Sequence, residues 1–351
     1  MINLSSAQIA EELQAFSARM AQGARILGEI GEIETGVSPR EPVHQEDKLT
    51  LYRYQPRVAE PHPVPLLIVY ALVNRPYMMD LQEDRSMIRG FLDAGLDVYL
   101  IDWGYADAED RHLNLGDYIN RYIGHCVDVL CQRSGLDAIN LLGVCQGGAL
   151  SLCFAALHPE KIRNLVTMVT PVDFDTPDNL LTHLIRHVDV DLLVDAFGNL
   201  PGQLLNFTFL SLSPFRLTGQ KYVDLVDILD DAQALKNFLR MEKWIFDSPD
   251  QAGEAFRQFA KDFFQQNKLV KGDVLIGERR VDLRKVVMPV LNVYATQDHL
   301  VPPASSRALA RCCGSRDYSE FSFRGGHIGI YVSARAQREV PPAIAAWLLT
   351  R

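Results

Sequence analysis

Short apolar runs alternate with amphipathic segments along most of the chain after Pro65, and this rhythm constrains the fold more than any other feature. It predicts buried strands at 66–70, 97–101, 139–143, 164–169, 289–294 and 320–323. It predicts helices at 84–94, at about 115–133, from just after Cys145 to 157, and at about 341–349 with Pro341 in the first turn. Strands and helices that alternate at this spacing indicate a mostly parallel sheet with helices on both faces.

The rhythm breaks between about residues 173 and 282, where helical segments are dense in leucine and aromatic residues at 204–215 and 238–264. This break predicts an inserted, mainly helical cap (lid) at 173–285 that ends in a hairpin around Gly277. The remaining parts, 61–172 and 286–351, form the expected core. Residues 1–60 are expected to supply an amphipathic N-terminal helix over 1–20 and lead-in strands.

Composition excludes several classes of function. The formal net charge is −9 and no long basic run is present, which argues against a nucleic-acid partner. No window reaches the ~18 apolar residues of a transmembrane segment, and the N-terminus lacks the apolar core of a signal peptide. Six cysteines without such a signal indicate reduced thiols in the cytoplasm, and their spacing favours no metal site. We therefore expect no metal and no cofactor.

A Gly-Val-Cys-Gln-Gly sequence lies at the expected strand-to-helix junction, with Cys145 at its centre. It matches the G-x-S-x-G nucleophile elbow with cysteine in place of serine, and its flanking glycines avoid clashes with the neighbouring strand and helix. The helix that follows favours a thiolate at its N-terminus. The backbone N–H of Gln146 is a candidate oxyanion donor, and Val73 or Asn74 is expected to supply the second. The alternative is a tight turn with a buried structural cysteine.

Two further polar residues follow the last two expected strands. Asp298 lies in the turn after 289–294, and His327 follows Gly325-Gly326 after 320–323. The order nucleophile, acid, base is that of an α/β-hydrolase, so we predict this fold with Cys145, Asp298 and His327 as a catalytic triad. His299 is the competing histidine for the role of base. Because it is beside the acid and not on the final loop, we expect it to line the pocket instead, as a substrate-binding or hydrogen-bonding residue.

A cysteine nucleophile suits thioester exchange, because the entering and leaving groups have similar basicity and the acyl group stays activated on the enzyme. His327 would deprotonate Cys145 for loading and could later deprotonate an incoming hydroxyl. The residues alone leave open whether the final acyl acceptor is a hydroxyl or water.

Longer motifs carry a family resemblance. The segments 143–148 (GVCQGG), 298–303 (DHLVPP) and 325–329 (GGHIG) closely resemble polyhydroxyalkanoate synthases, specifically the class III catalytic subunit. The likeness extends over 69–81, 99–104, 170–174 and 241–247, and covers the chain from about residue 65 to its end. No motif position departs from the family pattern.

The resemblance implies a cytoplasmic acyltransferase that polymerises (R)-3-hydroxyacyl groups, chiefly 3-hydroxybutyryl, from their CoA thioesters at the surface of polyester granules. It implies that Cys145 carries the growing chain as a thioester and that His327 activates its thiol. Asp298 would orient His327 or assist deprotonation of the 3-hydroxyl. A second, unrelated synthase subunit of the PhaE type would be needed for full activity.

The role of the cap is open at this stage. It could gate the pocket, guide the polymer or form a homodimer contact, or it could simply pack as ordinary core. The runner-up function is a cysteine-nucleophile hydrolase, such as an acyl-CoA thioesterase or a dienelactone-type hydrolase, with water as acceptor. A granule-associated scaffold without catalysis is a further alternative, against which the intact triad argues.

Overall fold

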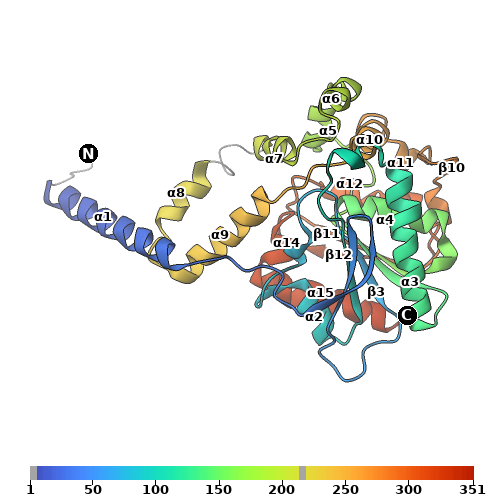
Figure 1. The fold of residues 1–351 in the computed structure, drawn as a ribbon, viewed down its shortest axis with the longest axis horizontal. Helices are drawn as coiled ribbons and strands as arrows, with labels where there is room; N and C mark the ends of the chain where they lie inside the picture. Colours follow the sequence, from blue (N-terminus) through green and yellow to red (C-terminus); the bar gives the residue numbers. More distant parts are fainter. Residues whose placement is uncertain (1–5, 213–218) are drawn as a thin grey trace.

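The chain is known from a computed structural model that describes residues 6–212 and 219–351 (Figure 1). Its centre is a sheet of eight strands in the order β1-β2-β6-β3-β7-β8-β11-β12. The strands are β1 (Arg40–Glu46), β2 (Leu49–Tyr54), β3 (Leu66–Val69), β6 (Val98–Asp102), β7 (Ile139–Val144), β8 (Ile162–Met168), β11 (Val290–Ala295) and β12 (Tyr318–Phe323). β2 pairs antiparallel with β1 and β6, and the other pairs are parallel. The mostly parallel sheet predicted from the apolar rhythm is confirmed.

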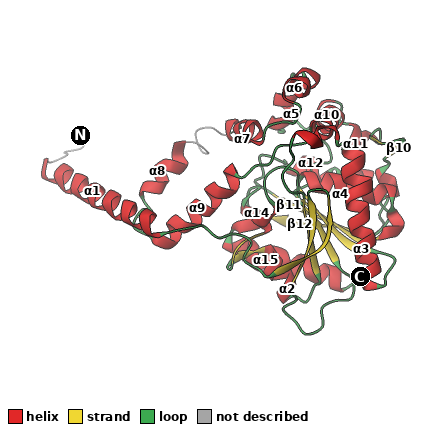
Figure 2. Cartoon of the chain, viewed as in Figure 1, coloured by secondary structure: helices red, strands yellow, loops and turns green. Residues whose placement is uncertain are grey.

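Helices cover both faces of this sheet (Figure 2). One face packs on α3 (Gly124–Ser134) and α4 (Gln146–Leu157), and the other on α2 (Met87–Asp93) and α15 (Ala334–Leu349). Successive residues of β3 alternate between the two cores, since Leu67 and Val69 join one and Leu66 and Ile68 the other. Because both faces are buried, these strands are continuous apolar runs.

One helix starts later than its sequence pattern suggested, and a second contains a π-helical stretch. Residues 80–86 form a small hairpin of β4 (Asp80–Gln82) and β5 (Arg85–Ser86), and α2 begins only at Met87. The Ser86 hydroxyl accepts a hydrogen bond from the Arg89 N–H and so caps this helix. The helix expected from about residue 115 is present from there: residues 115 and 116 are helical, the π-helical η3 (Asp117–Ile123) follows, and the helix continues as α3.

The predicted start of the C-terminal helix at Pro341 was wrong. α15 begins at Ala334, where the Ser333 hydroxyl accepts a hydrogen bond from the Ala336 N–H, and it carries Pro341 and Pro342 in its interior. Interior prolines remove helix hydrogen bonds, so this placement needs support from packing. That support comes from α2: a Cβ atom on Gly90 would lie 2.6 Å from the Cβ of Pro341, so the two helices touch closely there.

The segment between β8 and β11 is mainly helical, as predicted for a cap. Its helices are α5 (Leu180–Ile185), α6 (Val190–Phe197), α7 (Gly202–Ser211), α8 (Lys221–Val226), α9 (Ala232–Phe246), α10 (Gly253–Gln258), the π-helical η6 (Phe259–Gln265) and α11 (Lys268–Lys271). The expected hairpin at Gly277 is present as β9 (Leu275–Ile276) and β10 (Arg279–Arg280). Residues 213–215 of the expected leucine- and aromatic-rich segment lie outside the described residues.

Shorter elements complete the fold. They are η1 (Pro76–Met79), η2 (Ala108–His112), η4 (Pro159–Lys161), η7 (Leu283–Lys285), α12 (Pro303–Arg307), α13 (Leu309–Cys312) and α14 (Gly329–Val332).

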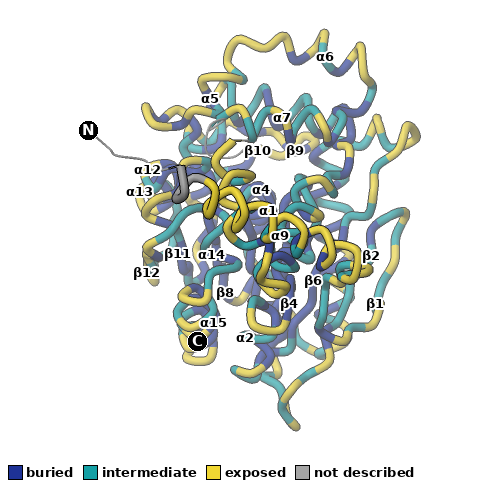
Figure 3. Tube along the Cα trace, turned by 90° about the vertical axis from the view of Figure 1, so that its left-hand side faces the viewer, coloured by how far each residue is buried: buried dark blue, intermediate teal, exposed yellow. Residues whose placement is uncertain are grey.

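The N-terminal helix α1 (Ser6–Glu29) extends beyond the predicted 1–20 and lies with α8 and α9 in an arm that projects from the body of the molecule (Figure 1). A small core of Ile26, Leu229 and Leu235 holds the arm together, and the outer surface of α1 is exposed (Figure 3). None of the helices in the described ranges is both long and apolar enough to cross a membrane.

Candidate active site

Cys145 occupies the sharp turn between β7 and α4. Its backbone has φ 53° and ψ −123°, a strained conformation for a residue with a side chain, and its N–H donates a hydrogen bond to the carbonyl of Met168 on β8. A Cβ on Gly143 would lie 2.5 Å from the Cα of Gly148, and a Cβ on Gly147 would lie 2.3 Å from the carbonyl oxygen of Val69. Both glycines are therefore required by close backbone approach, as the elbow motif predicted.

Asp298 and His327 meet although 29 residues separate them in the sequence. They follow β11 and β12, which are parallel neighbours, so both leave the same edge of the sheet. The His327 Nδ1 lies 2.7 Å from Asp298 Oδ2, while Asp298 Oδ1 accepts hydrogen bonds from the N–H groups of Leu300 and Val301. The Asp298 side chain has no exposed surface. This carboxylate is held in one orientation, with the imidazole aligned on it.

The third expected member of the triad lies beside the same imidazole. Burial of the His327 ring opposes its protonation, but the Asp298 carboxylate and the nearby Cys145 sulfur outweigh this penalty, and the pKa of His327 is raised well above its ordinary value. Because Nδ1 is occupied by Asp298, Nε2 is the nitrogen left for the thiol. The structure thus brings together the three residues that the sequence placed far apart.

The candidate oxyanion donors lie on two adjacent segments. Gln146 is the first residue of α4, where a helix leaves its N–H without an internal acceptor. The loop after β3 lies beside Gln146. In this loop the Leu72 N–H already donates a hydrogen bond to the Gln146 side-chain oxygen at 3.0 Å. Within the described parts of the chain, no acceptor receives the backbone N–H of Val73 or Asn74. These two residues therefore remain the candidates for the second donor.

Cys145 and His327 open into a cavity of about 590 Å³ between the core and the cap. His299 lines the same cavity, together with Val73, Asn74 and Gln146. Leucine, isoleucine, valine and phenylalanine make up most of the wall, and many of them lie on the cap helices α5, α6, α7, α9 and α10 and on η6. Among the described residues that line it there is no Lys, Arg, Asp or Glu. Such a cavity suits an apolar acyl group and offers no cation for a nucleotide phosphate.

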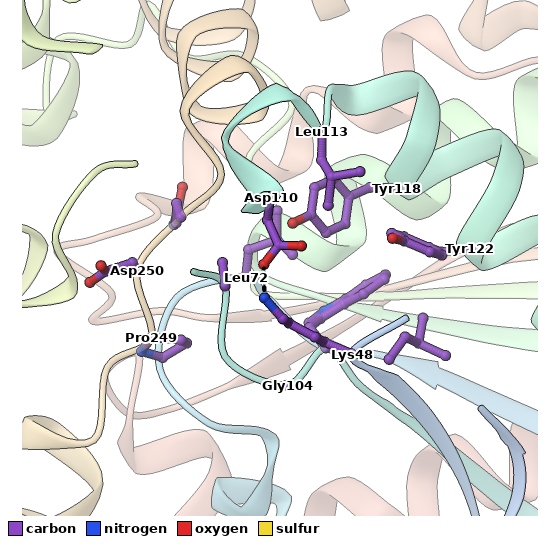
Figure 4. A pocket seen from close by; sticks show the side chains of 13 residues that line it. Lys48, Leu72, Gly104, Asp110, Leu113, Tyr118, Tyr122, Pro249 and Asp250 are labelled. Atoms are coloured by element: carbon purple, nitrogen blue, oxygen red, sulfur yellow. Dashed lines mark hydrogen bonds and ion pairs between the residues drawn. The ribbon is translucent and has the colours of Figure 1, made fainter. Parts of the chain in front are cut away.

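A second, smaller hollow lies beside the loop after β3 (Figure 4). Its volume is about 30 Å³, enough for water only, and Lys48 at its edge is neutralised by Asp110 and Asp107, each 2.5 Å away. Gln251 lines both hollows. This hollow is too small to hold a substrate and contains none of the expected triad.

Sequence patterns missed two aromatic residues that support the imidazole. The ring of Tyr331, on α14, lies edge-on to the His327 ring with centroids 6.1 Å apart, and it also contacts Tyr70 at 6.4 Å. Burial raises the pKa of both tyrosines, which keeps both hydroxyls protonated. The sequence did offer one indication of the Tyr331 contact: Tyr331 is only four residues after His327, in the segment that leads into the C-terminal helix.

The cysteine at a glycine-flanked strand-to-helix turn, the aspartate and histidine after neighbouring parallel strands, and the inserted helical segment are the features of the α/β-hydrolase fold. The family model of the alpha/beta hydrolase fold matches residues 64–334. A putative lipase from Sulfolobus solfataricus superimposes with a TM-score of 0.55 at 15% identity, covering 91% of this chain and 99% of that one. A monoacylglycerol lipase from Paleococcus ferrophilus gives 0.53 at 17% identity, covering 87% and 99%. At these identities the likeness shows the fold alone.

Relatives at much higher identity place the chain within this class. The poly(3-hydroxyalkanoate) polymerase subunit PhaC of Allochromatium vinosum is 61% identical over 100% of this chain and 99% of its own length. The subunit of the same name from Synechocystis is 57% identical over 96% and 91%. A model of the poly-beta-hydroxybutyrate polymerase N-terminus matches residues 8–91. The chain belongs to the poly(3-hydroxyalkanoate) polymerase PhaC family, which is a family of acyltransferase enzymes.

Proposed function

We propose that the chain transfers (R)-3-hydroxyacyl groups, chiefly 3-hydroxybutyryl, from CoA to a growing polyester held as a thioester on Cys145. The observation that carries this proposal is the sulfur of Cys145 beside the buried His327–Asp298 pair at the base of an apolar cavity, in a chain with relatives that match its whole length. The CoA thioester is the substrate, and the reaction we propose needs no cofactor or metal.

Loading begins when His327 accepts the thiol proton and the Cys145 sulfur attacks the thioester carbonyl. The N–H of Gln146, with that of Val73 or Asn74, would receive the negative charge that develops on the carbonyl oxygen. The carbon–sulfur bond to CoA then breaks, and the CoA thiolate takes the proton from His327. The acyl group stays activated because one thioester replaces another.

Chain extension requires a hydroxyl as nucleophile. His327 would remove the proton from the 3-hydroxyl of one acyl group while that oxygen attacks the thioester carbonyl of another, forming an ester and freeing a thiol. Both oxygens of Asp298 are occupied, one by His327 and one by two backbone N–H groups. This favours the role in which Asp298 orients His327 over direct deprotonation of the hydroxyl. His299, exposed at the cavity wall, would contact the substrate.

The proposal extends to the surroundings of the enzyme. Leu192, Phe207 and Phe246 on the cap are 67%, 71% and 62% exposed, which supports contact with apolar partners. We include among these the cytoplasmic polyester granule, a second subunit of the PhaE type and a homodimer contact through the cap.

Incubation of the purified chain with (R)-3-hydroxybutyryl-CoA tests the function, with and without a co-purified second subunit. We expect CoA release together with insoluble polymer, both increased by the second subunit. A Cys145→Ala variant should release no CoA above background while it unfolds at the same temperature as the wild type. Free 3-hydroxybutyrate in place of polymer would instead establish the thioesterase alternative.

A further inference from the structure

The loop after β3, which carries one of the two candidate oxyanion donors, is held from two sides. On the core side, Gln146 accepts a hydrogen bond from the Leu72 N–H at 3.0 Å. On the cap side, the Asn74 side-chain amide Nδ2 lies 2.6 Å from Ser248 Oγ and 3.3 Å from the carbonyl oxygens of Trp244 and Ile245. Val73, between these two anchors, has a backbone N–H that no described residue accepts.

Asn74 combines this contact with an unusual backbone. Its φ of +58° is in the left-handed region, which asparagine tolerates far better than most residues with a side chain. The conformation aims its amide at the end of α9. Asparagine at this position thus serves both the turn of the loop and the contact with the cap.

On the cap side, the residues that accept hydrogen bonds from Asn74 are joined to α7 and to the loop by further hydrogen bonds. Ser248 donates to the Asn206 side-chain oxygen at 2.8 Å, and the Asn206 amide donates to the Ile245 carbonyl at 2.5 Å. The Trp244 indole N–H donates to the Arg75 carbonyl at 2.9 Å. Asn206 belongs to α7 and lines the cavity, so the helices that bound the substrate space are tied through Ser248 to the loop beside Cys145.

We propose that Asn74 is a positioning residue that couples the seating of the cap to the oxyanion-binding loop. When residues 244–248 are in place, Asn74 holds the loop so that the Val73 N–H faces the carbonyl oxygen of an acyl group on Cys145. When the cap lifts to admit an acyl-CoA or to release polymer, Asn74 loses its acceptors and the donor loses its alignment. Acyl transfer therefore takes place only while the cap is in contact with the loop through Asn74. This inference rests on the proposed function.

Substitutions of Asn74 separate its two roles, which are to form the left-handed turn of the loop and to hold the cap through its side-chain amide. Asn74→Gly removes the amide and keeps the left-handed backbone accessible. Asn74→Asp keeps the shape and places a carboxylate opposite two carbonyl oxygens, which repels the cap. Asn237→Ala is the matched control, because it removes an amide from α9, the helix that Asn74 contacts, and among the described residues the Asn237 side chain has hydrogen bonds only with Gln233 and Arg240.

The assay compares two reactions of Cys145 in the chain with its co-purified second subunit. Acylation by 3-hydroxybutyryl-CoA develops an oxyanion, whereas alkylation by iodoacetamide does not. Removing one oxyanion donor lowers a rate by about 10²–10³. We expect Asn74→Asp to slow the single-turnover release of CoA at least about tenfold, with a smaller loss for Asn74→Gly, while alkylation stays within about twofold in every variant and Asn237→Ala matches the wild type. Equal acylation rates in all variants, or a matching loss in alkylation, would overturn the proposal.

Hydrogen exchange provides a readout that does not depend on the substrate. In Asn74→Asp, amides of both 72–75 and 244–248 should exchange faster than in Asn237→Ala. If the wild type releases no CoA, the proposed function fails, and this exchange experiment still decides the coupling. Faster exchange in the cap segment alone would show that the loop is held without Asn74.

Discussion

The elbow around Cys145 is tightly packed, whereas the arm formed by α1, α8 and α9 is loosely packed. Every residue of α4 behind the elbow is buried, and the neighbouring backbones approach so closely that glycine is required. The arm is joined mainly by Ile26, Leu229 and Leu235, while Leu13 and Phe16 on α1 are 61% and 49% exposed. A site that must hold atoms within fractions of an ångström needs the first kind of packing, whereas weakly packed segments open locally at low free-energy cost. α9 connects the two regions, since it begins in the arm and ends on the loop beside Cys145 (Figure 1).

The largest effect is expected from Gly147→Ala. The new Cβ would lie 2.3 Å and 2.5 Å from the carbonyl oxygens of Val69 and Tyr70, and neither backbone atom can move without displacing β3. We expect a loss of about 3 kcal/mol in the free energy of unfolding, the upper part of the range for overpacking, and CoA release near background. Urea denaturation and the CoA assay measure both.

The same substitution in the arm is the matched control. Gly28→Ala places a Cβ with no heavy atom within 4 Å, in a helix where alanine is favoured by about 0.5–1 kcal/mol. CoA release should stay unchanged. Equal losses in the two variants would remove the contrast between elbow and arm.

An intermediate effect is expected from His327→Gln. General acid–base catalysis contributes about 10²–10⁴ to a rate, so CoA release should fall by that factor. The pKa of His327 is raised in the folded state, so its stabilising effect is complete below its unfolded pKa of about 6.5 and disappears as pH rises through the raised value. The difference in unfolding free energy between wild type and variant should therefore shrink as pH increases from 6.

Thermal unfolding of the wild type and of His327→Gln, measured from pH 6 upward, gives this difference in unfolding free energy. His125→Gln, which removes a half-exposed histidine that pairs with Glu46 and does not line the cavity, should change the free energy of unfolding by no more than about 1 kcal/mol. A wild-type advantage that grows with pH would contradict the pairing of His327 with Asp298.

The smallest effect on catalysis is expected from Leu235→Ala. This side chain is buried in the small core of the arm, and its truncation should lower the local stability of α1 by about 2–5 kcal/mol while CoA release changes less than about twofold. Hydrogen exchange of α1 measures the loss. Leu13→Ala, on the exposed surface of the same helix, should leave that exchange nearly unchanged. A strong loss of CoA release in Leu235→Ala would show that the arm supports the site.

Most of the sheet could be predicted because each strand is a local pattern. Every strand expected after residue 65 is present within two residues of its predicted ends. The largest differences are at β8 and β12, which each begin two residues before the expected start; β12 lies on a half-exposed edge where the apolar signal is weak. The C-terminal helix was misplaced for a non-local reason, because the contact of Pro341 with Gly90 joins two helices far apart in sequence. Prolines usually indicate a helix start, and here packing overrides that preference.

The sequence by itself determined the order of strands and helices, the glycine-flanked turn at Cys145, and the positions of Asp298 and His327 after their strands. Each of these depends on chemistry within a few residues, such as side-chain periodicity or the room that glycine leaves at a bend. Only the tertiary structure decided that Asp298 Oδ1 is held by two backbone N–H groups, that Gln146 anchors the loop after β3, and that Asn74 reaches the cap. These contacts join segments up to 174 residues apart, and hydrogen bonds between such segments depend on which strands become neighbours, which no short pattern encodes.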